Sequence, residues 1–238
     1  MNGTWITFLN GILKMPGAKI DRAAFLSNTF KNLTPEERRI CIDESPLKVV
    51  DAATIDKKAS SIINVHTAKV TSLSAAAGIP GGIAMLATIP ADMANYYYHV
   101  VAVGQKLGYL YGFPDMVDDK GNLTGDGEVM LTAFIGVMNK VQTANQLIKS
   151  LAIEIGKRIS EETATRIAGN LLSKQIVAQT VEVIAKKLGT QITSRTASRS
   201  VTKLIPVVSG LICGALTYTT FRPQAKRLHA SLKANAIR

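Results

Sequence analysis

The stretch VTSLSAAAGIPGGIAMLATIPADMANYYYHVVAVGQ, Val70–Gln105, contains a single formal charge, Asp92, in a chain of 238 residues. Its polarity is that of a membrane segment, and it is longer than the roughly 20 residues that a spanning helix needs. Helix breakers interrupt it, however, at Pro80, Gly81, Gly82 and Pro90. Proline and glycine are disfavoured inside a regular helix. The stretch therefore predicts broken helices rather than one straight span.

Elsewhere, apolar residues recur at steps of three and four residues, which is the period of an amphipathic helix. One such segment is Thr54–Ser74, whose apolar stripe includes His66. A second runs over Glu128–Ile155, and a third over Ser160–Gly189, where the glycine stops it. No segment alternates in the manner of a strand. The expected fold class is therefore all-α, a single multi-helix bundle with two interrupted apolar segments.

The helix that follows the breakers has recognisable ends. Pro90 suits the first helical position, where proline is tolerated, and Asp92 then falls in the first turn, where the helix dipole favours a carboxylate. We expect this helix to continue to Tyr111 and to end at Gly112 and Pro114.

A second uncharged run, LIPVVSGLICGALTYTTF, spans Leu204–Phe221 and resembles the first in design. Pro206 is expected to start its helix. Gly210 and Gly214 have the G-x-x-x-G spacing that lets two helix backbones approach closely. That spacing occurs both in membrane helices and in tightly packed soluble bundles, so both interpretations stay open. We expect the two interrupted runs to pair as a helical core.

The net charge of +11 is concentrated at one end of the chain. From Val183 to Arg238 there is no Asp or Glu, whereas ten residues are Lys or Arg. Such a block favours an anionic partner, although a solvated basic surface without a partner is the plain alternative. The candidates for contact with an anionic partner are Lys186, Lys187, Arg195, Arg199, Lys203, Arg222, Lys226 and Arg227.

We expect residues 1–46 to form an N-terminal extension with a short amphipathic helix, and residues 47–238 to form the main domain. Trp5, Phe8, Leu9 and Ile12 fall on one face of that helix, as in an interfacial membrane anchor. Docking of the same face onto the protein's own core explains the pattern equally well. Because no basic residue precedes the apolar part, a secretory signal is not indicated. The expected location is cytoplasmic, with peripheral contact at the inner face of the membrane.

The sequence carries no nucleotide or metal signature. Gly78–Gly82 lacks the spacing of a dinucleotide fingerprint and the Lys-Ser/Thr of a P-loop, and the histidines show no metal pairing. We expect no cofactor and no metal. The catalytic candidates are Asp92 and His99, which share a helix face with Tyr96 and have the chemistry of an acid/base pair. The alternative is that Asp92 serves the helix N-terminus and His99 is a hydrogen-bonded core residue.

The segment IPADMANYYYHVVAVGQKLGYLYGFPD, Ile89–Asp115, resembles the EcsC family of bacterial proteins, as do AAAGIPGG before it (Ala75–Gly82) and KLIPVVSGLICGALTYTTF after it (Lys203–Phe221). The likeness covers about residues 45–235, and its strongest elements are Pro90-Ala91-Asp92 and Tyr111-Gly112-Phe113. It implies work next to a membrane, because the family's name is associated with the gene neighbourhood of an ABC transporter. The family offers no agreed catalytic residues to carry over.

We therefore expect a helical protein, not an enzyme, that associates reversibly with membrane or lipid through apolar helices and a basic C-terminal face. Two alternatives stay open: a soluble regulatory partner of a membrane transporter complex, and a hydrolase that acts on an apolar substrate through Asp92 and His99. Nucleic acid is not an expected partner, because no recognised motif accompanies the basic block. The residues expected to contact membrane or lipid are Trp5, Phe8, Leu9, Ile12, Ile79, Ile83, Met85, Val208 and Leu211.

Overall fold

The computed structural model describes residues 3–78, 82–118, 120–160, 179–186, 190 and 206–237. Within these residues the chain forms helices and turns, with one isolated β-bridge between Val117 and Leu123 and no strand. The expected all-α class is confirmed for this part of the chain.

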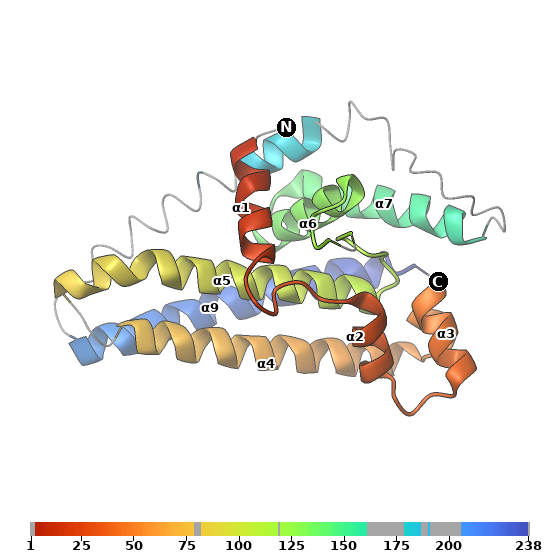
Figure 1. Cartoon of the computed structure of the whole chain (residues 1–238), viewed down its shortest axis with the longest axis horizontal. Coiled ribbons are helices and arrows are strands. Elements are labelled where there is room, and N and C mark those ends of the chain that lie inside the picture. The colour runs from red at the N-terminus through yellow and green to blue at the C-terminus, as the bar shows by residue number, and fades with distance from the viewer. Residues whose placement is uncertain are drawn as a thin grey trace.

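Three long helices lie side by side and form the base of the fold (Figure 1). They are α4 (Ala52–Gly78), α5 (Gly82–Leu110) and α9 (Pro206–Ala234). α9 contacts both α4 and α5, so the C-terminal part of the chain returns to the first long helix. The helices that carry the two interrupted apolar runs therefore pack together, and α9 begins at Pro206 as the sequence predicts.

α6 (Gly125–Met138) is the most buried helix of the described chain, and α7 (Gln142–Ser160) packs against it (Figure 1). Every residue of α6 from Gly127 to its end is buried among α5, α7 and α9. Such a helix needs its first N–H groups satisfied. Thr124 does this by accepting a hydrogen bond from the Gly127 N–H at 2.9 Å.

The N-terminal helices close one side of the bundle. α1 (Gly3–Leu13) and α2 (Arg22–Thr29) contact α5, and α3 (Pro35–Asp43) packs on α2 and on the 3-10 turn η1 (Pro46–Lys48). Apolar side chains from this region belong to the same core as those of the long helices. The division of the chain at residue 46 stays a prediction.

The single helix expected over Glu128–Ile155 is wrong, because the structure divides this segment into α6 and α7. The division lies at Lys140, whose φ of 60° is left-handed. The Val141 N–H then bonds to the Gly136 carbonyl at 2.9 Å, and the Lys140 N–H to the Val137 carbonyl at 3.1 Å, which is the Schellman pattern of a helix end. Hydrophobic periodicity does not predict this turn, because α6 is apolar on every side. Such a helix has no separate polar face, so the pattern does not show where it ends.

The expected start of the second long helix is also wrong. α5 begins at Gly82, so Pro90 lies inside the helix and Asp92 is not in its first turn. The intervening residues are mainly Ile, Ala, Met and Leu, which tolerate or favour helix, so helix formation extends upstream of the proline. The other end agrees with the sequence: α5 ends at Leu110, and Gly112 follows with a φ of 87°.

The helix expected from Ser160 to Gly189 lies mostly outside the described residues. Ser160 is the last residue of α7 rather than the first of a new helix. Residues 179–186 are helical, and within them Val181 and Ile184 are buried as expected.

Gly127 occupies a place where a side chain does not fit. A Cβ there would lie 1.8 Å from the backbone oxygen of Met116, which also accepts a hydrogen bond from the Thr124 N–H at 3.2 Å. Because a backbone oxygen cannot rotate away, we expect Gly127→Ala to lower the free energy of unfolding by about 1–3 kcal/mol, as overpacking does. Urea unfolding followed by circular dichroism measures the loss.

Gly125→Ala is the matched control, since it makes the same change in the same helical turn. A Cβ at Gly125 meets nothing within 4 Å. We expect its free energy of unfolding to stay within about 1 kcal/mol of the native value. Equal losses in the two variants would contradict the contact with Met116.

Candidate functional site

α4 and α9 pack antiparallel, which brings C-terminal basic residues beside α4. Near one end, a Cβ on Gly214 would lie 3.1 Å from the Cβ of Ala75, so the two backbones approach closely there. Near the other end, the Lys233 ammonium binds the carboxylate of Asp56. At Gly214, the G-x-x-x-G spacing thus corresponds to close packing between helices of one bundle.

Asp56 is the centre of a polar network that joins α4, α9 and the end of α5. The Tyr111 hydroxyl donates to Asp56 Oδ1 at 2.8 Å, and His229 Nε2 lies 2.8 Å from the Tyr111 oxygen. Since the hydroxyl proton goes to the carboxylate, the His229 Nε2–H donates to the hydroxyl oxygen. The hydrogen bond from Lys233 lowers the pKa of Asp56, whereas burial and then Asp56 raise the pKa of Tyr111. The network fixes the register of α9 on α4.

A groove of about 380 Å³ lies between α4 and α9 beside this network. Its described lining holds several cations and no carboxylate, and consists of Ser60, Ile63, Asn64, Arg222, Lys226, His229, Ala230 and Lys233. The Arg222 guanidinium lies over the ring of Tyr218, 5.8 Å from the centroid. Ammonium, guanidinium, hydroxyl and amide groups are all donors, so the groove is suited to an oxyanion.

The groove belongs to a wider surface, which we call the α4–α9 face and define by Tyr218, Arg222, Lys226 and Lys233. The two lysines are exposed, and Tyr218 exposes 45% of its surface. Steps of four residues place Tyr218, Arg222 and Lys226 on one side of α9. Basic side chains beside exposed apolar ones are typical of surfaces that meet a membrane interface.

The apolar side of α1 packs against the core of the protein. Trp5, Leu9 and Ile12 are buried, and the Trp5 indole N–H donates to the Thr132 hydroxyl of α6 at 3.0 Å. Phe8 is half-buried between aromatic rings, with its centroid 5.7 Å from that of Trp5. The structure thus shows docking onto the core, which was the alternative to an interfacial anchor.

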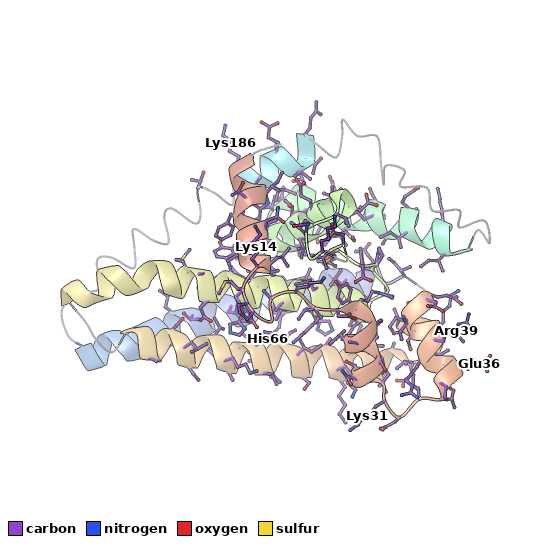
Figure 2. The ribbon with its side chains drawn as sticks, viewed as in Figure 1. Lys14, Lys31, Glu36, Arg39, His66 and Lys186 are labelled. Atoms are coloured by element: carbon purple, nitrogen blue, oxygen red, sulfur yellow. The ribbon has the colours of Figure 1, made fainter. Side chains whose placement is uncertain are left out.

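Two basic candidates lie apart from the α4–α9 face. The half-buried Arg227 donates to the Met138 carbonyl oxygen, 2.6 Å from Nη2 and 3.1 Å from Nε. It therefore satisfies the C-terminal end of α6. Lys186 is exposed at the edge of the molecule opposite α4 (Figure 2).

The remaining candidates have side chains outside the part of the chain that the structure describes. They are Ile79, Ile83, Met85, Asp92, Lys187, Arg195, Arg199, Lys203, Val208 and Leu211. Their expected contacts stay predictions.

His99 meets His66 across the interface of α5 and α4, near the His66 label in Figure 2. The two Nδ1 atoms are 2.9 Å apart, and Lys106 Nζ lies 3.0 Å from His66 Nε2. His66 exposes 6% of its surface and His99 3%. His99 is thus a hydrogen-bonded core residue, one of the two roles that the sequence left open. The sequence singles out His99 and places His66 in an apolar stripe, but no local pattern pairs the two residues.

Burial keeps both imidazoles neutral near pH 7. It lowers the pKa of His66 to about 3 and that of His99 to about 4, and Lys106 and Lys69 add repulsion. Burial and the charge of Lys69 also lower the pKa of Lys106. The cluster is therefore a hydrogen-bonded chain of neutral rings next to cations.

Comparison of the chain with protein-family models, curated proteins and solved structures finds no match. The resemblance to the EcsC family therefore stays a prediction. Within the described residues, none of the helices combines enough length and hydropathy to cross a bilayer. The same residues contain no group of three or more His, Cys, Asp or Glu placed to hold a metal ion.

The histidine pair predicts that stability depends on pH. Each folded-state pKa lies below the unfolded value near 6.5, so the unfolded chain binds protons that the folded chain does not. Stability is therefore complete above about pH 6.5 and falls as the pH decreases toward about 4. We expect each ring to account for a loss of about 1–2 kcal/mol between about pH 7 and pH 5, measured by urea unfolding.

His99→Asn isolates the contribution of one ring. Asparagine keeps an acceptor near the position of Nδ1 but does not titrate. We expect the loss of stability between the two pH values to be smaller in this variant by about 1–2 kcal/mol. An unchanged pH dependence would show that His99 is not buried as a neutral group.

Proposed function

We propose that the protein associates reversibly with anionic membrane surfaces through the α4–α9 face. The observation that carries the proposal is the groove between α4 and α9 in which Arg222 and Lys226 lie beside the ion pair of Lys233 with Asp56, with no carboxylate in its described lining. Phosphate and carboxylate groups of lipid headgroups are oxyanions that such donors bind.

Charge and apolar contact act together on this surface. A Lys or Arg near an anionic membrane contributes about 1 kcal/mol, and the attraction falls off within a Debye length, about 10 Å at 0.1 M salt. Tyr218 adds an amphipathic ring, a type of side chain that resides at headgroup level. A few charges with little apolar area give binding that is sensitive to salt and readily reversed.

The other functions considered from the sequence receive less support. The hydrolase hypothesis needs Asp92 beside His99, but the described partner of His99 is His66. A regulatory partner of a membrane transporter would use the same basic face against an acidic protein surface. The resemblance to the EcsC family agrees with membrane-adjacent work and requires no catalytic residues.

Vesicle co-sedimentation tests the proposal. We expect the native protein to pellet with vesicles that contain phosphatidylserine and to stay in solution with phosphatidylcholine alone. The double variant Arg222→Glu/Lys226→Glu reverses two charges of the α4–α9 face, so its affinity is expected to fall by at least about 30-fold. Both side chains point away from the core, and circular dichroism checks that the variant is folded.

Lys149→Glu/Lys186→Glu is the control with the same change in net charge. Lys149 is exposed on α7, and Lys186 lies on the side away from α4. We expect this variant to bind within about threefold of the native protein, because screening removes distant charges. Equal losses in the two double variants, or native protein that never pellets at low salt, would refute the proposal.

A further inference from the structure

A second cavity, of about 410 Å³, lies on the other flank of α4, between α4 and α5. Its size is in the range of small-ligand sites. Val65, Lys69 and Leu73 are exposed, so the cavity opens to solvent along α4. The described lining contains no Asp or Glu and none of the cations of the α4–α9 face. It consists of Gly17, Ser61, Ile62, Val65, His66, Lys69, Leu73, Asn95, Tyr98, His99 and Lys106.

Lys106 is the lysine that α5 contributes to this cavity. Its side chain is half-buried, and its Nζ lies 3.0 Å from Nε2 of His66. An ammonium ion has donors only, so the charged Lys106 donates to His66. His66 is held in turn by His99, because the two Nδ1 atoms are 2.9 Å apart. The histidine pair therefore fixes the position of the lysine nitrogen at the wall of the cavity.

No group in the described lining compensates a charge on Lys106. His66 accepts its hydrogen bond as a neutral ring, and Lys69 is a second cation beside it. The other titratable groups of the lining are His99 and Tyr98, neither of which is a carboxylate. Burial and then the charge of Lys69 lower the pKa of Lys106 from the ordinary lysine value of 10.5. A desolvated lysine beside another cation is an arrangement that activates the amine as a nucleophile.

The neutral amine of Lys106 has an electron pair that its hydrogen bond does not use. One N–H still donates to His66 Nε2, and the tetrahedral nitrogen then directs its electron pair away from that ring. The cavity also offers apolar surface, since Val65 and Leu73 expose 47% and 51% of their side chains and Ile62 lies beside them. Covering such surface favours a ligand with an apolar chain.

We infer that Lys106 binds an apolar aldehyde in this cavity as a Schiff base. The electron pair of Nζ attacks the carbonyl carbon, and the carbonyl oxygen takes up a proton to give a carbinolamine. The C–O bond then breaks, and a C=N bond to Nζ forms. Both hydrogens of the amine and the oxygen of the aldehyde leave as one water molecule, so the step needs no oxidant or reductant.

Reductive trapping with hexanal tests the inference on the native full chain. Cyanoborohydride reduces the C=N bond to a stable secondary amine, and peptide mapping by mass spectrometry locates the label. The reference is Lys149, an exposed lysine on α7. We expect Lys106 to be labelled at least about tenfold faster than Lys149 near pH 7. Labelling of Lys106 that is no faster than that of Lys149 would overturn the inference.

Glycolaldehyde tests the contribution of the apolar lining. It offers the same carbonyl group without an apolar chain, and the ratio to Lys149 cancels the difference in intrinsic reactivity between the two aldehydes. We expect the preference for Lys106 to fall to about threefold or less with glycolaldehyde. An equal preference with both aldehydes would refute the assignment of an apolar ligand.

The pH dependence of labelling tests the electrostatic environment of Lys106. In the native protein we expect the midpoint of its labelling rate to lie below the ordinary lysine value of 10.5, because only the neutral amine reacts. Lys69→Met removes the neighbouring cation and is expected to move this midpoint to higher pH. A midpoint of 10.5 or above in the native protein would contradict the inference.

Lys106→Arg keeps the positive charge and the donors toward His66 but removes the nucleophilic amine. We expect the label on this part of α5 to disappear while the circular dichroism spectrum stays native. Arg222→Glu/Lys226→Glu is expected to be labelled by hexanal like the native protein. Failure at this cavity and failure at the α4–α9 face are therefore distinguishable.

Discussion

The antiparallel contact between α4 and α9 is the interaction on which the rest of the structure depends. The close approach of Gly214 to Ala75 and the ion pair of Lys233 with Asp56 set its two ends. Because α9 is held against α4 in this way, its inward-facing residues also bind the C-terminal end of α6. There Gln224 donates to the Asn139 side chain at 3.1 Å, and Arg227 binds the Met138 carbonyl. The same helix thus carries inward groups that hold the fold and outward cations that form the α4–α9 face.

α4 has a comparable division of its surface. Ile55, Ala59, Ile63 and Val70 are buried and hold the helix in the bundle. Polar residues on either side of this stripe border different cavities, with Asn64 in the groove toward α9 and His66 in the cavity toward α5. One long helix therefore lies between a basic groove and the cavity that the histidine pair borders.

Much of the fold follows from periodicity and breakers, and the failures have physical causes. The stripe over Thr54–Ser74 and the proline at 206 predict α4 and the start of α9, because an amphipathic face and a first-turn proline are local properties. The turn at Lys140 is not predicted by periodicity, because α6 is buried on every side and has no amphipathic pattern that ends there. The expected helix start at Pro90 is wrong because a helix with enough neighbouring helix formers and contacts accommodates one missing hydrogen bond.

The candidate sites were less predictable, because they depend on the register between helices. The basic block indicates an anionic partner, but Lys226 and Arg227 are adjacent in sequence and differ by about 100° around the helix, so one faces outward and the other binds α6. Likewise, no local pattern predicts that His66 meets His99 or that Asp56 meets Lys233. These pairs form because the packing of α4 against its neighbours brings their side chains together.

We propose that the α4–α9 face is the surface that meets a membrane. Paramagnetic broadening of backbone amide signals, in protein bound to anionic nanodiscs whose lipids carry a nitroxide at the headgroup, tests this placement. We expect broadening to be strongest around Asn64 and Lys226 and weak around Lys149 on α7. Broadening that is strongest on α6 or α7, or that is uniform over the molecule, would contradict it.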